Sequence, residues 1–144
     1  MTQIEIREFQ YPADYDRVID LWNSAGSGVH VGPSDTPQEL QKKLKRDPDL
    51  FLVAASGEEI VGSAIGGFDG RRGMIYHVAV APAHRRQGLA TRLMREIEER
   101  LRAKGCIKCY LLVFPDNADA IEFYKQIGWN VMSNVIFAKE FSVS

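Results

Sequence analysis

The residues best suited to chemistry lie in the stretch "VAPAHRRQGLAT", from Val80 to Thr91. It places two arginines and a glycine between an apolar strand-like run and an amphipathic helical pattern. The first N–H groups of a helix have no intrahelical partner and carry partial positive charge, which favours a bound anion. Gly88 has no side chain to keep a ligand from this backbone, and Arg85 and Arg86 add positive charge. The stretch predicts a cradle for a pyrophosphate.

This cradle differs from the common nucleotide-binding motifs. It lacks the Lys-Ser/Thr pair of a P-loop and the three glycines of a dinucleotide-binding turn, so ATP and NAD are poor candidates. The alternative is a helix start with incidental arginines, and local physics alone leaves both interpretations open.

The composition is that of an ordinary globular protein. A chain of 144 residues fits one domain, over residues 1–144, with 45% hydrophobic and 26% charged residues and a net charge of -1. Because lysine and arginine are not in excess, nucleic-acid binding is not favoured. The first residues contain no apolar signal-peptide core, and no run has the length of a membrane span. We expect a cytoplasmic protein without nucleic-acid or membrane partners, either a monomer or a homodimer.

Two cysteines, Cys106 and Cys109, form the only C-x-x-C motif. A zinc site needs four ligands, and neither a second pair nor nearby histidines accompany this one. A thioredoxin-like pair sits where a strand enters a helix, whereas this pair follows a helix and precedes a strand. We interpret both as small thiols without a role, and we expect no metal.

Apolar periodicity predicts an α/β (α+β) fold with the order β-α-α-β-β-β-α-β-α-β-β and a mixed sheet. Three glycines in one strand, Gly62, Gly66 and Gly67, indicate a bulge or the close approach of another group. The expected helices open at Pro12, at Pro37 behind Thr36, at Leu89 and at Asn117. The expected strands lie at Ile4 to Ile6, Leu50 to Ala55, Ile60 to Phe68, Met74 to Val80, Tyr110 to Phe114, around Val131 and at Val135 to Phe141.

Further motifs surround the cradle in a fixed order. "RRQGLA" fits the pattern R/Q-x-x-G-x-G/A through Arg85, Gly88 and Ala90, and "VAV-x-P" precedes it. Downstream, "N-x-x-A-x-x-F-Y" and "Y-x-x-x-G-W" share Tyr124 and end at Trp129. With these motifs in this order, the segment from about Met74 to Trp129 resembles the GCN5-related N-acetyltransferase (GNAT) family.

The resemblance implies a mostly antiparallel central sheet in which two strands, Met74 to Val80 and Tyr110 to Phe114, splay apart. Acetyl-coenzyme A would pair its pantetheine arm with the backbone of Val78 and Val80, and an N–H near Val80 would polarise the thioester carbonyl. The residues that the resemblance assigns to the cofactor are Val78, Ala79, Val80, Arg85, Arg86, Gln87, Gly88, Leu89, Ala90, Thr91, Asn117 and Phe123.

The implied activity is the direct transfer of an acetyl group from acetyl-coenzyme A to a primary amine. Tyr124 resembles the family's general acid, which protonates the departing thiolate. The alternatives are that Tyr124 belongs to the core and that Asn117 is only a helix cap. A sensor that binds acyl-coenzyme A without turnover is the second hypothesis, and a purely structural protein is the third.

The general base is unassigned. Relatives often carry a carboxylate at positions that correspond here to Met74 and Leu112, and neither side chain accepts a proton. By strand alternation Tyr76 shares a face with Met74, whereas His77 faces away unless a bulge rotates it. A histidine on a strand is more often structural. Three loop residues are also conceivable bases, namely Asp116, Asp69 and His30.

The acceptor amine is also open. The resemblance points to Trp22 and to the segment from Gly26 to Asp35 as its binding region. Because that segment is poor in acidic residues, a polycationic aminoglycoside is not indicated. Small amines, amino acids, and the N-terminus or lysines of a protein remain.

Overall fold

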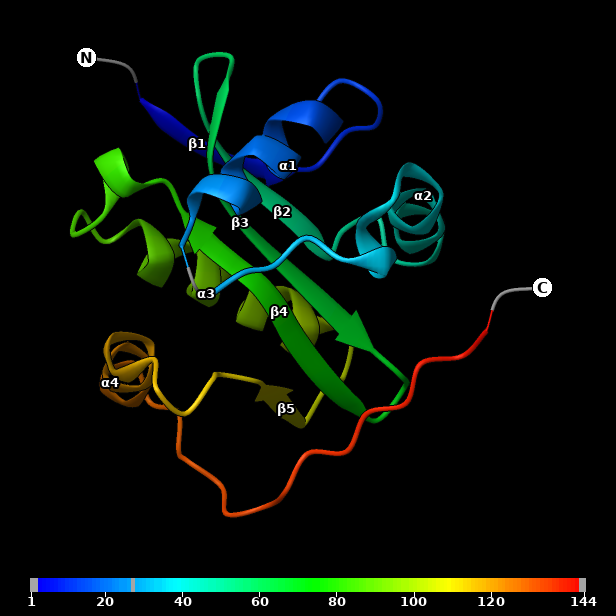
Figure 1. Ribbon diagram of the computed structural model, residues 1–144, viewed down its shortest axis with the longest axis vertical. Coiled ribbons are helices and arrows are strands. Elements are labelled where there is room, and N and C mark those ends of the chain that lie inside the picture. Colours follow the sequence, from blue (N-terminus) through cyan, green and yellow to red (C-terminus); the bar gives the residue numbers. More distant parts are fainter. Residues whose placement is uncertain (1–2, 27, 143–144) are drawn as a thin grey trace.

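A five-stranded sheet with helices on both faces forms the centre of the molecule (Figure 1). The computed structural model describes residues 3–26 and 28–142. Its strands are β1 (Ile4–Glu8), β2 (Phe51–Ser56), β3 (Glu59–Phe68), β4 (Arg72–Val80) and β5 (Lys108–Leu111). Its helices are α1 (Tyr15–Ser24), α2 (Pro37–Arg46), α3 (Leu89–Ala103) and α4 (Ala118–Gln126), with short 3-10 turns η1 (Pro33–Asp35) and η2 (Pro82–His84).

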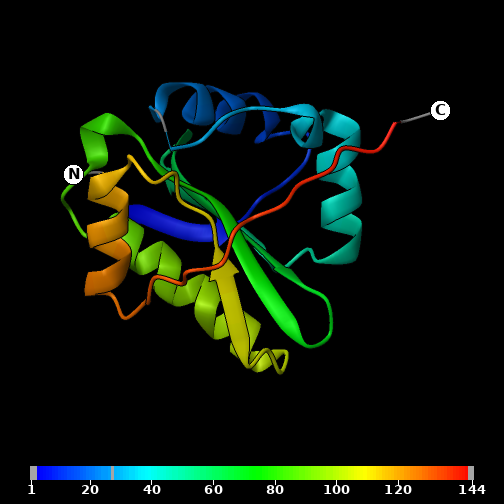
Figure 2. The same cartoon turned by 60° about the horizontal axis from the view of Figure 1, so that its bottom comes forward.

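The strands follow one another across the sheet in sequence order, from β1 to β5. The first four pair antiparallel, and β5 pairs parallel with β4. Figure 2 shows α1 and α2 on one face of the sheet and α3 and α4 on the other. The α/β class with a mixed, mostly antiparallel sheet is confirmed. Among the described residues, no helix is long and apolar enough to cross a membrane.

Each face of the sheet has its own apolar core, because strand side chains alternate between the two faces. In and before β2, Leu50, Leu52 and Ala54 face one cluster and Phe51 and Val53 the other. The first cluster contains the stripe of α3 that recurs every four residues, and all of its members are buried: Leu89, Leu93, Ile97 and Leu101. The second contains the inner side of α1, with Val18, Leu21 and Trp22.

Strands β4 and β5 stay together over only part of their length. Arg72 to Ile75 pair with Lys108 to Leu111, and the rest of β4 has no partner on that side among the described residues. The expected strand from Tyr110 to Phe114 is therefore wrong in its bounds, since β5 ends at Leu111. Leu112 and Phe114 leave the sheet and are largely exposed. The two strands splay apart as expected.

The two strands expected after α4 do not form. Residues 129–142 run as extended chain without a strand partner in the described structure (orange to red in Figure 1). Val135 and Phe137 are 79% and 92% exposed. Alternating polarity is a local signal, whereas a strand exists only where a second backbone pairs with it. The expectation of strands at Val131 and at Val135 to Phe141 is corrected on this ground.

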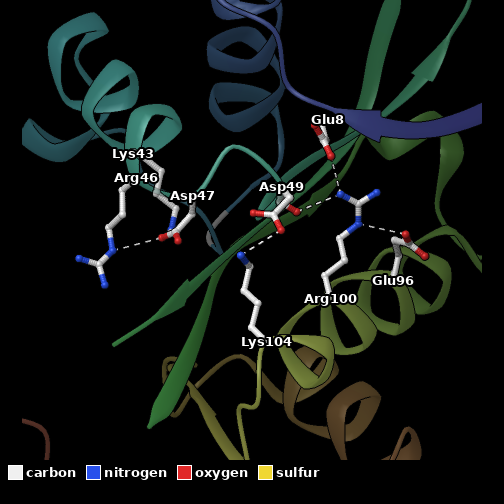
Figure 3. A network of polar contacts seen from close by, with 8 residues as sticks. All are labelled: Glu8, Lys43, Arg46, Asp47, Asp49, Glu96, Arg100 and Lys104. Carbon is white, nitrogen blue, oxygen red and sulfur yellow. Dashed lines mark hydrogen bonds and ion pairs between the residues drawn. The ribbon is translucent and has the colours of Figure 1, made fainter. Parts of the chain in front are cut away.

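A polar network joins the loop before β2 to the elements on both sides (Figure 3). Arg100 of α3 bonds the Glu8 carboxylate at 2.7 Å, the Asp49 carbonyl at 3.0 Å and Glu96 at 3.0 Å. Lys104 pairs with the Asp49 carboxylate at 3.0 Å. Exposed pairs of this kind each contribute less than about 1 kcal/mol, so the network fixes the position of the loop more than it adds stability.

The close approach predicted for a β3 glycine occurs at Gly62 and gives a stability test. A Cβ atom there would lie 2.9 Å from Leu93 Cδ1 and 3.3 Å from the Ala79 carbonyl oxygen, whereas at Gly67 the nearest atom is 3.8 Å away. We expect Gly62→Ala to lower the free energy of unfolding by about 1–3 kcal/mol through overpacking. Gly67→Ala, its matched control, should change it by less than about 0.5 kcal/mol. Urea denaturation measures both, and equal effects would contradict the packing.

Candidate active site

A cavity of about 90 Å3 lies where β4 and β5 separate. Main-chain and side-chain atoms of both strand ends form its walls, and α4 closes one side. Its lining residues are Gly28, Ile75, Tyr76, His77, Val78, Leu111, Leu112, Val113, Phe114, Asn117, Ala120 and Tyr124. An apolar cleft with a few polar groups is the usual form of a small-molecule site. The imidazole of His77 and the phenol of Tyr124 give this one its chemistry.

A second, wider hollow of about 450 Å3 lies elsewhere on the surface, between the end of α2 and the β3–β4 turn. Its polar groups already bind one another, because Arg46 donates to the Phe68 carbonyl and Lys104 pairs with Asp49. Asp69 accepts hydrogen bonds from the N–H groups of its own turn. The hollow therefore presents few free groups to a ligand, and the smaller cavity is the better candidate.

A β-bulge lies in β4 at His77, where the strand borders this cavity. In the ladder Ser63 lies opposite Ala79 and Ile65 opposite Tyr76, so His77 and Val78 together face the single residue Ala64. His77 has φ +51°, in the left-handed region that non-glycine residues rarely adopt. Strand alternation predicts that His77 faces away unless a bulge rotates it, and the bulge that this exception requires is present.

Hydrogen bonds from β3 and α1 hold the bulge. The Ser63 hydroxyl donates to the His77 carbonyl oxygen at 2.7 Å, and the Trp22 indole N–H donates to the Ser63 oxygen at 2.8 Å. The Trp22 ring lies 4.5 Å from the imidazole, edge to face. Trp22 is fully buried. Its expected place on the acceptor-binding surface is therefore wrong, and it packs beneath the site instead.

A buried carboxylate pairs with the imidazole. His77 Nε2 lies 2.9 Å from Asp35 Oδ1 and 3.0 Å from Oδ2. Asp35 is 5% exposed, and its carboxylate also accepts from the Gly32 N–H at 3.0 Å. Sequence reasoning missed this partner, because an aspartate before a helix in a glycine-rich loop usually faces solvent. Nothing local signals that the fold brings it to a residue 42 positions away.

Tyr124 of α4 lines the same cavity as His77. Burial raises the pKa of its phenol to about 12. The side chain therefore remains a protonated donor at neutral pH. Its ring packs at 5.1 Å from that of Phe123 and at 6.4 Å from that of Trp129, whose indole N–H donates to Glu98 of α3. These contacts join the end of α4 to α3 and fix the position of the Tyr124 phenol.

The helix start on which the predicted cradle depends lies at Gly88. Gly88 is the N-cap with φ +78°, and Arg92 is the first residue whose N–H bonds back to it, at 3.1 Å. The N–H groups of Leu89, Ala90 and Thr91 consequently have no intrahelical partner. Gln87 and Gly88 are exposed, so solvent reaches this backbone.

The side chains around the cradle divide between binding and packing. Arg85 donates to the Val80 carbonyl at 3.2 Å and to the Ala25 carbonyl at 2.6 Å, so it also braces the loop after α1. Arg86 has φ +63° and an exposed side chain. Leu89 points into the core, and only its backbone faces the cradle.

The other residues expected at the cofactor take different positions. Val78 lines the cavity, whereas Ala79 and Val80 are buried in β4. Asn117 also lines it, and its side-chain oxygen caps α4 by accepting from the Ala120 N–H at 3.2 Å. The structure thus shows the helix cap, and the contact of Asn117 with the cofactor stays a prediction. Phe123 packs against the α3 core and does not line the cavity.

The structure also places the other conceivable bases. Leu112 lines the cavity. Met74 and Tyr76 share one face of the sheet, and each of these two side chains is about 40% exposed. His30 packs edge-on against Phe114, with ring centroids 5.7 Å apart. Asp116 is not among the residues that line the cavity, and Asp69 belongs to the wider hollow. Of the titratable candidates, only His77 is among the residues that line the cavity.

The cysteine pair lies away from this site. Cys106 and Cys109 are both free thiols that pack against Gly73 of β4. Burial, and next the neighbouring Cys106, raise the pKa of the Cys109 thiol to about 12. Within residues 3–26 and 28–142, no group of three or more His, Cys, Asp or Glu side chains could hold a metal ion.

Comparison with known sequences identifies relatives over nearly the whole chain. The Acetyltransferase (GNAT) family matches residues 15–129. An acetyltransferase of Sodalis glossinidius is 38% identical over 134 residues, which cover 92% of each chain. An acetyltransferase of Pectobacterium atrosepticum is 38% identical over 137 residues, 94% of each chain.

Solved structures share the fold at lower identity. The PaiA N-acetyltransferase of Thermoplasma acidophilum, solved with coenzyme A, superposes with a TM-score of 0.80 at 18% identity, over 92% of this chain and 93% of that one. An aminoglycoside 6'-N-acetyltransferase of Acinetobacter haemolyticus gives a TM-score of 0.75 at 22% identity, over 96% and 99%. These likenesses support the α/β architecture.

The raised pKa of Cys109 predicts slow alkylation in the native protein. Thiolate is the reactive form, and with a pKa of about 12 only about one Cys109 in 10,000 is ionised at pH 8. We expect iodoacetamide to modify native Cys109 about a thousand-fold more slowly than the urea-unfolded chain, as peptide mass spectrometry would show. The native rate should rise about ten-fold per pH unit above pH 8. Equal native and unfolded rates would contradict the burial.

Proposed function

The chain belongs to the GNAT acetyltransferase family and is an N-acetyltransferase, and we propose that it transfers acetyl directly from acetyl-coenzyme A to a primary amine. The acceptor would be a small molecule or the N-terminus or a lysine of a protein. The observation that carries the proposal is the cavity between the splayed β4 and β5, which is lined by Tyr124 with its protonated phenol. The exposed N-terminus of α3, the next helix after β4, adds an anion-binding group.

Acetyl-coenzyme A would bind in an extended conformation, with its pantetheine arm beside β4 and its charged pyrophosphate at the start of α3. Its pyrophosphate would accept from the N–H groups of Leu89, Ala90 and Thr91, and Arg86 would add positive charge. Its pantetheine arm would lie along β4 beyond Ile75, where the strand has no partner on the β5 side in the described structure. The PaiA protein, which has the same fold, was solved with coenzyme A, and this supports the assignment.

The phenol of Tyr124 would complete the transfer. The amine nitrogen attacks the thioester carbonyl carbon, the C–N bond forms, and the C–S bond breaks with its electron pair on sulfur. Tyr124 then donates its proton to the departing thiolate, and the phenol regains a proton from the nitrogen that has become the amide. The raised pKa of this phenol ensures that the proton is present at neutral pH.

Thiol release across a broad panel of amines tests the function. An enzyme releases coenzyme A when the right amine is present, and a sensor binds acetyl-coenzyme A in calorimetry without release. Absence of binding would reject both and leave the purely structural hypothesis. Amino acids, small diamines and peptides with free N-termini or lysines separate the acceptor classes in the same assay.

Gly88 tests the cradle with an isosteric pair of variants. Asp and Asn have the same shape and both tolerate the left-handed backbone at φ +78°, so they differ here mainly in charge. A carboxylate against a pyrophosphate repels it by about 1 kcal/mol or more. We expect Gly88→Asp to bind acetyl-coenzyme A about ten-fold more weakly than Gly88→Asn in calorimetry. Equal affinities would reject the cradle as the pyrophosphate site.

Tyr124→Phe tests the general acid. The substitution keeps the ring packing against Phe123 and Trp129 and removes only the hydroxyl. Thermal stability and acetyl-coenzyme A affinity should change little, whereas kcat should fall by about a hundred-fold because the thiolate leaves unprotonated. Steady-state kinetics with saturating substrates measures this. A wild-type kcat would remove Tyr124 from the mechanism.

A further inference from the structure

We propose that His77, oriented by Asp35, is the proton acceptor for the attacking amine. This assignment rests on the proposed acetyl transfer and supplies the base that neither Met74 nor Leu112 can provide. His77 is the catalytic residue in this proposal because it lines the cavity, where its imidazole would meet the amine. Asp35 is a positioning residue because it acts through the imidazole.

The contact with Asp35 fixes the tautomer of the ring. An ionised carboxylate has only acceptor positions, and both of its oxygens lie within 3.0 Å of His77 Nε2. Nε2 therefore carries the hydrogen. In the neutral imidazole Nδ1 is then the bare acceptor, and it has no hydrogen-bond donor among the described residues. An imidazole held in this way, in a residue that lines the cavity and with one free lone pair, is the arrangement a general base requires.

The surroundings keep this orientation fixed. Asp35 is buried, and the Gly32 N–H binds its carboxylate at 3.0 Å, while the Tyr15 hydroxyl donates to its carbonyl at 2.8 Å. The left-handed backbone of His77 costs about 1–2 kcal/mol and persists because Ser63 holds its carbonyl. Strain of this kind concentrates at functional sites, where it aims a side chain that regular strand geometry would turn away.

The other groups around the imidazole do not compete for the proton near neutral pH. Asp35 reaches it from η1, Tyr76 from β4 itself, and Tyr124 shares the cavity from α4. Burial raises the pKa of Tyr76, with further contributions from the charges of Asp47 and Asp35, and burial also raises that of Tyr124. Burial also raises the pKa of Tyr15, whose hydroxyl contacts the Asp35 carbonyl. All three phenols therefore stay neutral.

The proton balance of the reaction then closes. The acceptor enters as an ammonium ion, and His77 Nδ1 takes one of its protons, which leaves a neutral amine and an imidazolium whose Nε2–H still donates to Asp35. The amine attacks the carbonyl carbon, the C–N bond forms, and the C–S bond breaks with its electron pair on sulfur. Tyr124 gives a proton to the thiolate and regains one from the new amide nitrogen. The imidazolium releases its proton to water.

A pH series with several amines tests the assignment. If His77 takes the proton, the acid limb of kcat/KM at subsaturating acceptor lies at the same pH for every amine. If the amine arrives already deprotonated, the limb moves with the pKa of the amine. We expect the fixed limb in the wild-type enzyme, and a limb that follows the amine would overturn the proposal.

Two variants of His77 preserve the bulge, because Asn and Gly both accept the left-handed backbone. We expect His77→Asn to lower kcat by about a hundred-fold or more, to lose the fixed limb, and to keep its affinity for acetyl-coenzyme A. His77→Gly should regain activity when imidazole is added, which a structural role for the ring would not produce. His30→Asn, which changes the other histidine near the cavity, should keep the fixed limb. Loss of that limb in His30→Asn alone would overturn the assignment.

Asp35→Asn tests the positioning role with a readout that needs no turnover. In nitrogen-15 NMR spectra the wild-type His77 ring should show hydrogen on Nε2, and Asp35→Asn should shift the population toward hydrogen on Nδ1, because an amide can donate to Nε2. A wild-type ring with hydrogen on Nδ1 would overturn the proposal whatever the activity.

If the enzyme releases thiol but His77→Asn is unimpaired, the base assignment fails and the acetyltransferase remains. If no amine supports release, both fail.

Discussion

The hydrogen bond from the Ser63 hydroxyl to the His77 carbonyl is the contact on which the site depends. It fixes the bulge at which two residues of β4 oppose one of β3, and the Trp22 indole in turn orients the hydroxyl. All three groups are inside the protein, where an unpaired polar atom costs about 1–3 kcal/mol. The bulge is thus the arrangement in which these buried polar groups are satisfied, and it sets the direction of every later residue in β4.

The separation of β4 from β5 begins next to this bulge. Pairing ends at Ile75 and Leu111, just before the bulge. Beyond that point the cavity opens, and residues of α4 line it together with both strand ends. The buried stripe of α3 anchors this helix on β2, β3 and β4, so the orientation of its N-terminus is determined by core packing. The apolar cores on the two faces thereby place the parts of the site.

Burial gives the two candidate proton-transfer groups different roles. A phenol that is removed from water without a charged partner keeps its proton, as the raised pKa of Tyr124 shows. The imidazole of His77 is instead held in one tautomer by a buried carboxylate, which accepts from Nε2 and leaves Nδ1 as the acceptor. One wall of the cavity is therefore suited to giving a proton and the other to taking one.

The sequence by itself determined the features that depend on neighbouring residues. The α3 stripe, the Gly88 turn, the Thr36 and Asn117 caps and the GNAT motifs are local patterns, and the structure contains them. The tertiary structure alone decided where the chain leaves regular geometry. The bulge at His77 requires Ser63 of another strand, and the partner of the imidazole, Asp35, comes from a distant loop. Alternation around Val135 predicted a strand that lacks a pairing backbone. Periodicity reports which face a segment can bury, whereas pairing and hydrogen bonding across the fold decide which face it does.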